Sequence, residues 1–102
     1  MAFQLEELSL ELIDALVSLM PRIKQRDKTL EDQLRRAASS IGLNVAEAAL
    51  SDPGNKRARF HTAAGSARET QHALRQAIAW RHVRAEEAER ALADLPATCR
   101  AA

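Results

Sequence analysis

Apolar residues recur at spacings of three and four along most of the chain, a pattern that predicts amphipathic helices. The first segment shows it most clearly, at Leu5, Leu8, Leu12, Leu16, Leu19 and Ile23. Acidic residues fill much of the rest of this segment. Pro21 lies inside the pattern, so we expect a helix over about 5–20 that ends near Met20 or kinks there. The polar run from Lys24 to Thr29 predicts the first loop.

Similar patterns predict three further helices. Thr29, followed by Asp32, is a capping signal for a second helix over about 30–50. The stretch "SDPGN" stops that helix, and its Asp52 and Pro53 suit the start of a third helix.

We expect this third helix over about 54–82 and a short fourth helix over about 86–95, ended by Pro96. Four helices joined by short loops are typical of an up-down bundle. The sequence therefore predicts one all-α domain, residues 1–102, folded as a four-helix bundle with a short fourth helix.

The second predicted helix has two unusual sides. With 100° per residue, the core positions fall within about 40° of one direction; they are Leu34, Ala38, Ile41, Val45 and Ala48. The opposite side carries Arg36, Ser40, Leu43 and Glu47, and a strip of small residues, Ser39, Gly42 and Ala46, lies between the two. So few charges leave two interpretations open. The helix is an ordinary surface helix, or, as we prefer, a neighbouring subunit buries its second side.

Three residues extend the second interpretation. Glycine in a helix costs up to about 1 kcal/mol relative to alanine, so Gly42 predicts close helix packing. Arg36 and Glu47 are too far apart on one helix to pair with each other. We therefore expect them to pair with other helices or across subunits.

The third predicted helix has two apolar stripes. The core line is Phe60, Ala64, Ala67, Leu74 and Ile78, and beside it lie Ala63, Ser66, Ala73, Ala77 and Trp80. Trp80 is interpreted as a packing anchor in the core or at an interface.

Basic residues are concentrated in the middle of the chain. The net charge is only +1, but residues 35–84 hold nine basic and three acidic residues. Candidate nucleic-acid contacts start at "NKRARFH" and continue along the third helix: Lys56, Arg57, Arg59, His61, Arg68 and Arg75. Cations at a helix N-terminus oppose the helix dipole, and a bound phosphate would offset that cost. The alternative is a solvated face whose arginines pair with the acidic first or fourth helix.

Other chemistry is weakly indicated. Glu69 and His72 have the Glu-x-x-His spacing of di-iron bundles, but those sites need two such motifs, so a surface contact is the simpler interpretation. Cys99 is the single cysteine and has no histidine near it in the sequence. We expect no catalytic, metal or cofactor site. The absence of a signal segment and of a membrane span predicts a cytoplasmic protein.

Two stretches resemble a known family. "QLRRAASSIGLNVAEA", with Phe60 and "AAGSARE" after it, is similar to the four helix bundle proteins, also called 23S rRNA-intervening-sequence proteins. The residues that match are Gln33, Leu34, Arg35, Arg36, Ala37, Ser40, Ile41, Asn44, Ala46 and Glu47, then Phe60, Ala63, Gly65, Ser66 and Glu69. Ala48 replaces the usual glycine, and the first helix lacks the customary tryptophan.

This resemblance implies a left-handed bundle that assembles into a ring, typically a pentamer. Some members are encoded in inserts of ribosomal RNA genes. A related branch, the accessory proteins of diversity-generating retroelements, is basic and binds nucleic acid and a reverse transcriptase. Most members have no established activity.

The sequence thus favours a non-enzymatic homo-oligomer that serves as a nucleic-acid-binding accessory or scaffold, with RNA, DNA or a protein as partner. Its candidate interface residues are Arg36, Ser40, Leu43, Asn44, Glu47 and Trp80. The alternative is a purely structural protein-interaction module that binds no nucleic acid.

Overall fold

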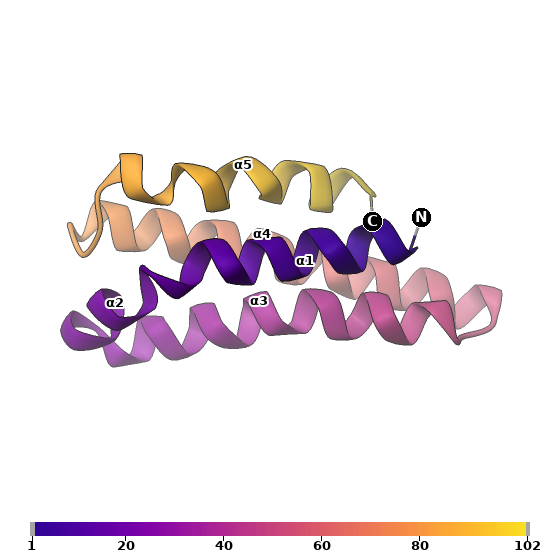
Figure 1. The fold of residues 1–102 in the computed structure, drawn as a ribbon. Coiled ribbons are helices and arrows are strands. Elements are labelled where there is room, and N and C mark those ends of the chain that lie inside the picture. Colours follow the sequence, from indigo (N-terminus) through magenta and orange to yellow (C-terminus); the bar gives the residue numbers. More distant parts are fainter. Residues whose placement is uncertain (1, 102) are drawn as a thin grey trace.

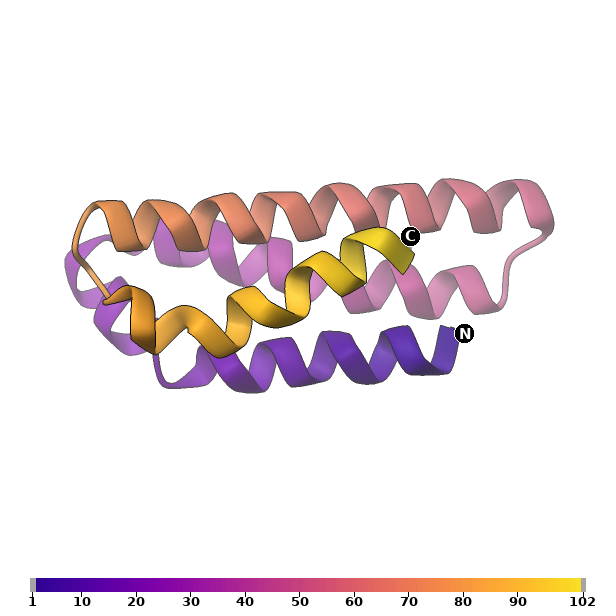
Figure 2. The same ribbon diagram turned by 90° about the horizontal axis from the view of Figure 1, so that it is seen from above.

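The computed structural model describes residues 2–101, apart from the side chains of residues 2, 3, 94 and 96–101. The described residues form helices and turns, and the helices are α1 (Ala2–Val17), α2 (Met20–Arg26), α3 (Lys28–Ala49), α4 (Pro53–Ala79) and α5 (Ala85–Ala101). Four long helices run up and down an elongated body of 43 × 22 × 17 Å, and α2 is a short helix at one end (Figures 1 and 2). The predicted all-α bundle is confirmed.

The helices are arranged around a square. Helix α3 packs against α1 and α4, and α5 packs against α4 and α1. As a result α3 and α5 lie on opposite sides of the bundle (Figure 1). The turn between α4 and α5 lies at the same end as α2, whereas the turn between α3 and α4 lies at the other end.

The connection after α1 differs from the prediction. Helix α1 ends at Val17, and Pro21 lies in the first turn of α2. Proline has no N–H to donate to the preceding turn, but it fits a first helical turn, so it starts a new helix here. The predicted loop over 24–29 was wrong, because only Asp27 separates α2 from α3.

Asp27, not Thr29, caps α3. Its side chain accepts a hydrogen bond from the Leu30 backbone N–H at 3.0 Å. Its other oxygen lies 3.5 Å from Nε2 of His82, in the turn between α4 and α5. Asp27 therefore both begins α3 and holds a second turn at this end of the bundle.

Replacing Asp27 with alanine is expected to lower the free energy of unfolding by about 1 kcal/mol, because the cap is lost. Asn is an equally good cap, so Asp27→Asn is the matched control and is expected to recover most of that loss. Urea unfolding followed by circular dichroism measures both. Equal stability of the alanine and asparagine variants would contradict the capping role.

The C-terminal ends of the predicted third and fourth helices also differ from those in the structure. Helix α4 ends at Ala79, and the chain turns through Arg81, whose φ of 67° lies in the left-handed region. The Arg81 guanidinium donates to the Ile78 and Ala79 carbonyls at the end of the helix, and the Arg81 backbone N–H also donates to the Ile78 carbonyl at 3.0 Å.

Helix α5 runs through Pro96 to Ala101, so its predicted end at Pro96 was wrong. With 17 residues it is as long as α1, which has 16, and the expected short fourth helix is corrected. Ala88, Ala91 and Leu95 are buried just before the proline, and this packing keeps the helix on the bundle.

The core confirms the predicted face of α3. Its five core residues are all buried, together with apolar residues of α1, α2, α4 and α5. On α4, Leu74 and the predicted alanines are buried, and Phe60 and Ile78 pack at the edge of the core. Trp80 is 66% exposed, so within one chain it is not a core anchor.

Gly42 packs against α1 of its own chain. A Cβ atom built on it would lie 2.7 Å from the Ser9 Oγ, closer than real Cβ atoms come to a neighbour. Ser9 is itself buried. The predicted close approach is present, but an intrachain contact already accounts for it.

Candidate nucleic-acid interface

The outward side of α4 carries a row of positive and titratable side chains, here called the basic stripe: Arg57, His61, Arg68, His72 and Arg75. Successive members are four, seven, four and three residues apart, which keeps them within about 60° of one another around the helix. All are exposed. The stripe is about 27 Å long at 1.5 Å per residue.

No member of the basic stripe forms an ion pair with any residue that the structure describes. Glu69 is the only acidic residue of α4. These arginines therefore carry positive charge that the described residues leave unneutralised.

Arg59 differs from the other candidates. Its guanidinium pairs with the Glu47 carboxylate at 3.0 Å and lies 3.4 Å from the Asn44 Oδ1, both on α3. The prediction that Glu47 pairs with another helix is confirmed. Arg36 instead pairs with Asp32 on its own helix at 3.1 Å, so that part of the prediction was wrong.

A line of polar contacts joins α3 to α4. The Ser66 hydroxyl donates to the Ser40 Oγ at 2.9 Å. The Asn44 amide donates to the backbone carbonyl of Ser40 at 2.8 Å and to its Oγ at 3.0 Å. With the Arg59–Glu47 pair, these contacts set the register of the two helices. Ser40, Asn44 and Glu47, predicted to lie at a subunit interface, thus have partners inside one chain.

A shallow groove of about 700 Å³ lies between α3 and α4 beside the basic stripe. It is lined by Gln33, Arg36, Ala37, Ser40, Ser66, Arg68, Glu69, His72, Ala73 and Gln76. Arg68 and His72 belong to both the groove and the stripe. The two features form one continuous polar surface, and Arg36, which is paired with Asp32, lines it from α3.

The structure separates the sequence candidates into groups. Arg57, His61, Arg68 and Arg75 share one face, whereas Lys56 lies to one side of it beside Phe60. His72 was missed as part of this surface. The spacing of the five residues from 57 to 75 was the signal that could have found it.

Metal binding finds no support in the described side chains, where no group of three or more His, Cys, Asp or Glu residues could hold an ion. The side chain of Cys99 lies outside the described residues. No helix in the described range is both long and apolar enough to cross a membrane.

Comparison with known proteins places the chain in a family. Residues 3–101 match the sequence profile of the family described as 23S rRNA-intervening sequence protein. The chain belongs to this family. Many of the residues that line the α3–α4 groove, including Gln33, Ser40 and Ser66, are those that carry the resemblance to the 23S rRNA-intervening sequence proteins.

A solved structure agrees with this fold. It is a protein of unknown function from the S23 ribosomal protein family of Bacteroides thetaiotaomicron, 23% identical, with a TM-score of 0.85. The likeness covers 95% of this chain and 93% of that one. At this identity the comparison supports the bundle itself and no activity. No curated protein matches the chain.

Proposed function

We propose that this member of the 23S rRNA-intervening sequence family is a non-enzymatic, cytoplasmic homo-oligomer that binds the phosphate backbone of RNA or DNA through the basic stripe. It would act as an accessory or scaffold. The observation that carries the proposal is the row of three exposed arginines, Arg57, Arg68 and Arg75, without an ion-pair partner in the described part of the chain.

The chemistry of the stripe favours backbone contacts over base recognition. Arginine suits phosphate because its planar guanidinium offers two parallel donors. Apart from the imidazoles of His61 and His72, the stripe contains no aromatic side chain on which a base could stack. Binding is therefore expected to tolerate many sequences and to weaken steeply with salt.

The homo-oligomer is supported by apolar side chains that the chain leaves uncovered. Of the six large apolar side chains exposed in the described range, Leu10, Ile13 and Val17 lie on α1, and Leu43 and Leu50 lie on α3 or directly after it. Several stripes in one assembly would bind a long nucleic acid more tightly than one stripe, through effective concentration. The family resemblance favours a pentamer.

The test is fluorescence anisotropy with duplex RNA and duplex DNA from 20 to 200 mM salt. Joint replacement of Arg57, Arg68 and Arg75 by alanine is expected to weaken binding by about tenfold or more at low salt and to reduce the salt slope by about 3. The matched control removes three arginines outside the stripe, Arg22, Arg84 and Arg90, with the same change in net charge. Equal losses in both variants would contradict the assignment of the stripe.

The second candidate function is a purely structural protein-interaction module. The exposed apolar side chains of α1 and α3 are the observation that favours it. Failure of the wild-type protein to bind either duplex at 20 mM salt would remove the nucleic-acid role and leave this alternative.

A further inference from the structure

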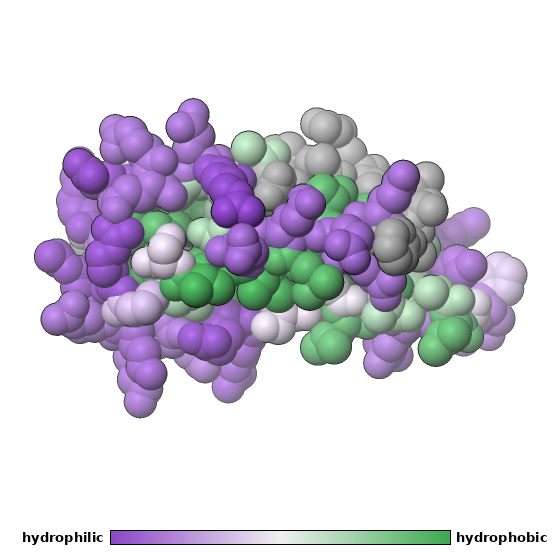
Figure 3. Space-filling view, viewed as in Figure 1, coloured by the Kyte–Doolittle hydropathy of each residue, from purple (hydrophilic) through white to green (hydrophobic). Residues whose placement is uncertain are grey.

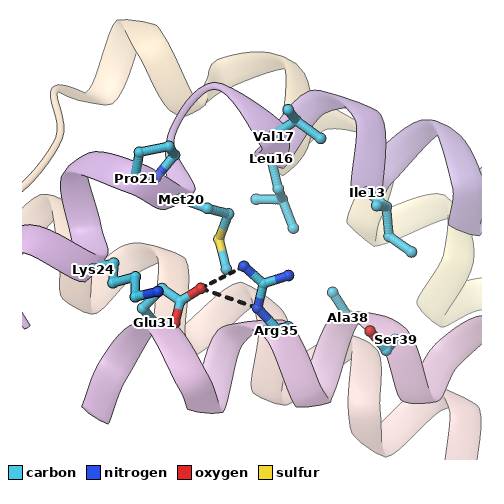
Figure 4. A pocket seen from close by; sticks show the side chains of 10 residues that line it. All are labelled: Ile13, Leu16, Val17, Met20, Pro21, Lys24, Glu31, Arg35, Ala38 and Ser39. Carbon is cyan, nitrogen blue, oxygen red and sulfur yellow. Dashed lines mark hydrogen bonds and ion pairs between the residues drawn. The ribbon is translucent and has the colours of Figure 1, made fainter. Parts of the chain in front are cut away.

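An apolar groove of about 410 Å³ runs between α1, α2 and α3 (Figure 4). Its apolar lining is Ile13, Leu16, Val17, Met20, Pro21 and Ala38. Leu16 and Met20 are buried, but Val17 is 61% exposed at the rim. The groove therefore offers an apolar surface that the single chain leaves open to water.

One end of this groove is positively charged. The Glu31 carboxylate is only 7% exposed, and one of its oxygens accepts hydrogen bonds from Nε and Nη2 of Arg35 at 3.0 and 2.7 Å. This pair holds the guanidinium of Arg35 over the groove, toward Met20 and Leu16 (Figure 4). Lys24 lines the same end and has no ion pair in the described part of the chain. Arg35 cancels the charge of Glu31, so Lys24 leaves the end positive.

The apolar surface continues beyond the groove. The space-filling view shows it along the middle of the face that α1 and α3 form, with hydrophilic side chains gathered at the α2 end (Figure 3). Leu10 on α1 and Leu43 on α3 are exposed, and Ser39 and Ala46 add no charge to these helices. A contiguous apolar face of this kind marks a protein contact.

Helix α5 carries a complementary surface. The side chains of Ala85, Glu86, Glu89, Leu92 and Ala93 lie along one side of α5 around a shallow hollow of about 470 Å³, and this row of side chains is here called the α5 ridge. Glu87 pairs with Arg22 and Arg84. Glu86 and Glu89 pair with no residue that the structure describes. The ridge thus presents two free carboxylates beside small apolar side chains.

The two surfaces lie at corresponding heights. Helix α5 begins at the end of the bundle where α2 lies, and α3 and α5 are on opposite sides (Figures 1 and 2). Rotation about an axis parallel to the bundle keeps every residue at its height. Glu86 and Glu89 of one copy therefore come level with Lys24 and Arg35 of the next. A contact between two different surfaces repeats from copy to copy and closes into a ring when the rotation allows it.

We propose that the groove between α1, α2 and α3 receives the α5 ridge of a second copy of this chain. Glu86 and Glu89 meet Lys24 there, beside the Arg35–Glu31 pair, and Leu92 and Ala93 cover the apolar rim. The inference rests on the homo-oligomer of the proposed function and assigns its two surfaces. Opposite charges fix the order and the height of the copies, and the apolar rim supplies the area removed from water.

Reversal of single charges tests this docking. Lys24→Glu and Glu89→Lys are each expected to raise the protein concentration at half-assembly by about tenfold or more, because like charges then face each other. The double variant K24E/E89K is expected to assemble again. An equal mixture of the two single variants is expected to recover assembly in part, because alternating copies meet opposite charges, whereas a ring of five copies keeps at least one mismatched contact. Multi-angle light scattering measures the mass, and circular dichroism confirms the fold.

Matched reversals away from both surfaces, Glu7→Lys and Lys56→Glu, are expected to leave the mass unchanged. If the wild type is oligomeric and the K24E and E89K variants have the same mass as the wild type, this inference is wrong, whereas the proposed oligomer is retained. A wild type that is monomeric at tens of micromolar would overturn both. The anisotropy measurement on the basic stripe is independent of either result.

Discussion

Replacing Leu34 with alanine is expected to lower the free energy of unfolding by about 2–5 kcal/mol, whereas Leu43→Ala is expected to change it by less than about 0.5 kcal/mol. Both residues are leucines of α3, nine positions apart. Leu34 is 0% exposed and lies in the main core, and Leu43 is 67% exposed. The alanine leaves a cavity at the first position and removes only solvated surface at the second.

Urea denaturation at low protein concentration, where monomers dominate, provides the measurement. The comparison tests the orientation of α3 directly, since the helix propensities of leucine and alanine enter both variants equally. Similar losses at the two positions would show that α3 is rotated about its axis relative to the structure.

Alanine at Gly42 and alanine at Gly65 are expected to act in opposite directions. Both glycines lie inside helices, where alanine gains up to about 1 kcal/mol. At Gly65 nothing lies within 4 Å of the added methyl group, so the gain remains. At Gly42 the methyl group meets the Ser9 Oγ at 2.7 Å, and Ser9 donates a hydrogen bond to the Glu6 carbonyl. Displacing that hydroxyl is expected to give a net loss of about 1–2 kcal/mol.

A double-mutant cycle isolates the contact. Ser9→Ala removes the Oγ and leaves a Cβ at 3.4 Å, an ordinary contact distance. The Ser9→Ala/Gly42→Ala protein is therefore expected to regain most of the loss, with a coupling of about 1 kcal/mol between the two sites. Additive effects would place the cost of Gly42→Ala elsewhere in the helix.

The periodic features of the fold were predictable. The core side of α3 and the cap of α4 by Asp52 follow from residue spacing and from side chains that bond their own neighbourhood. The Asp52 carboxylate accepts the Asn55 backbone N–H at 3.0 Å, and this hydrogen bond lowers the pKa of Asp52. Both features are local, so the sequence contains what decides them.

The errors concern features that depend on distant residues. Pro96 disrupts a helix locally, yet α5 continues past it after Ala88, Ala91 and Leu95 have packed in the core. Asp27 and Thr29 could both cap a helix, and Asp27, which does so, also contacts His82 in the turn after α4, a contact that residue spacing does not predict. The ion-pair partner of Arg59 was also not predictable from residue spacing, because Glu47 lies on the other side of the turn between α3 and α4.

The two faces of the bundle formed by α3 and by the outer side of α4 differ in how freely their residues can be changed. Helix α3 meets the core, α4, Ser9 of α1 and the apolar groove, so few of its positions are free to change. The outer face of α4 is less constrained, because the arginines of the basic stripe are exposed and lie outside the core. Substitutions there can therefore add or remove positive charge while the bundle itself stays unaltered.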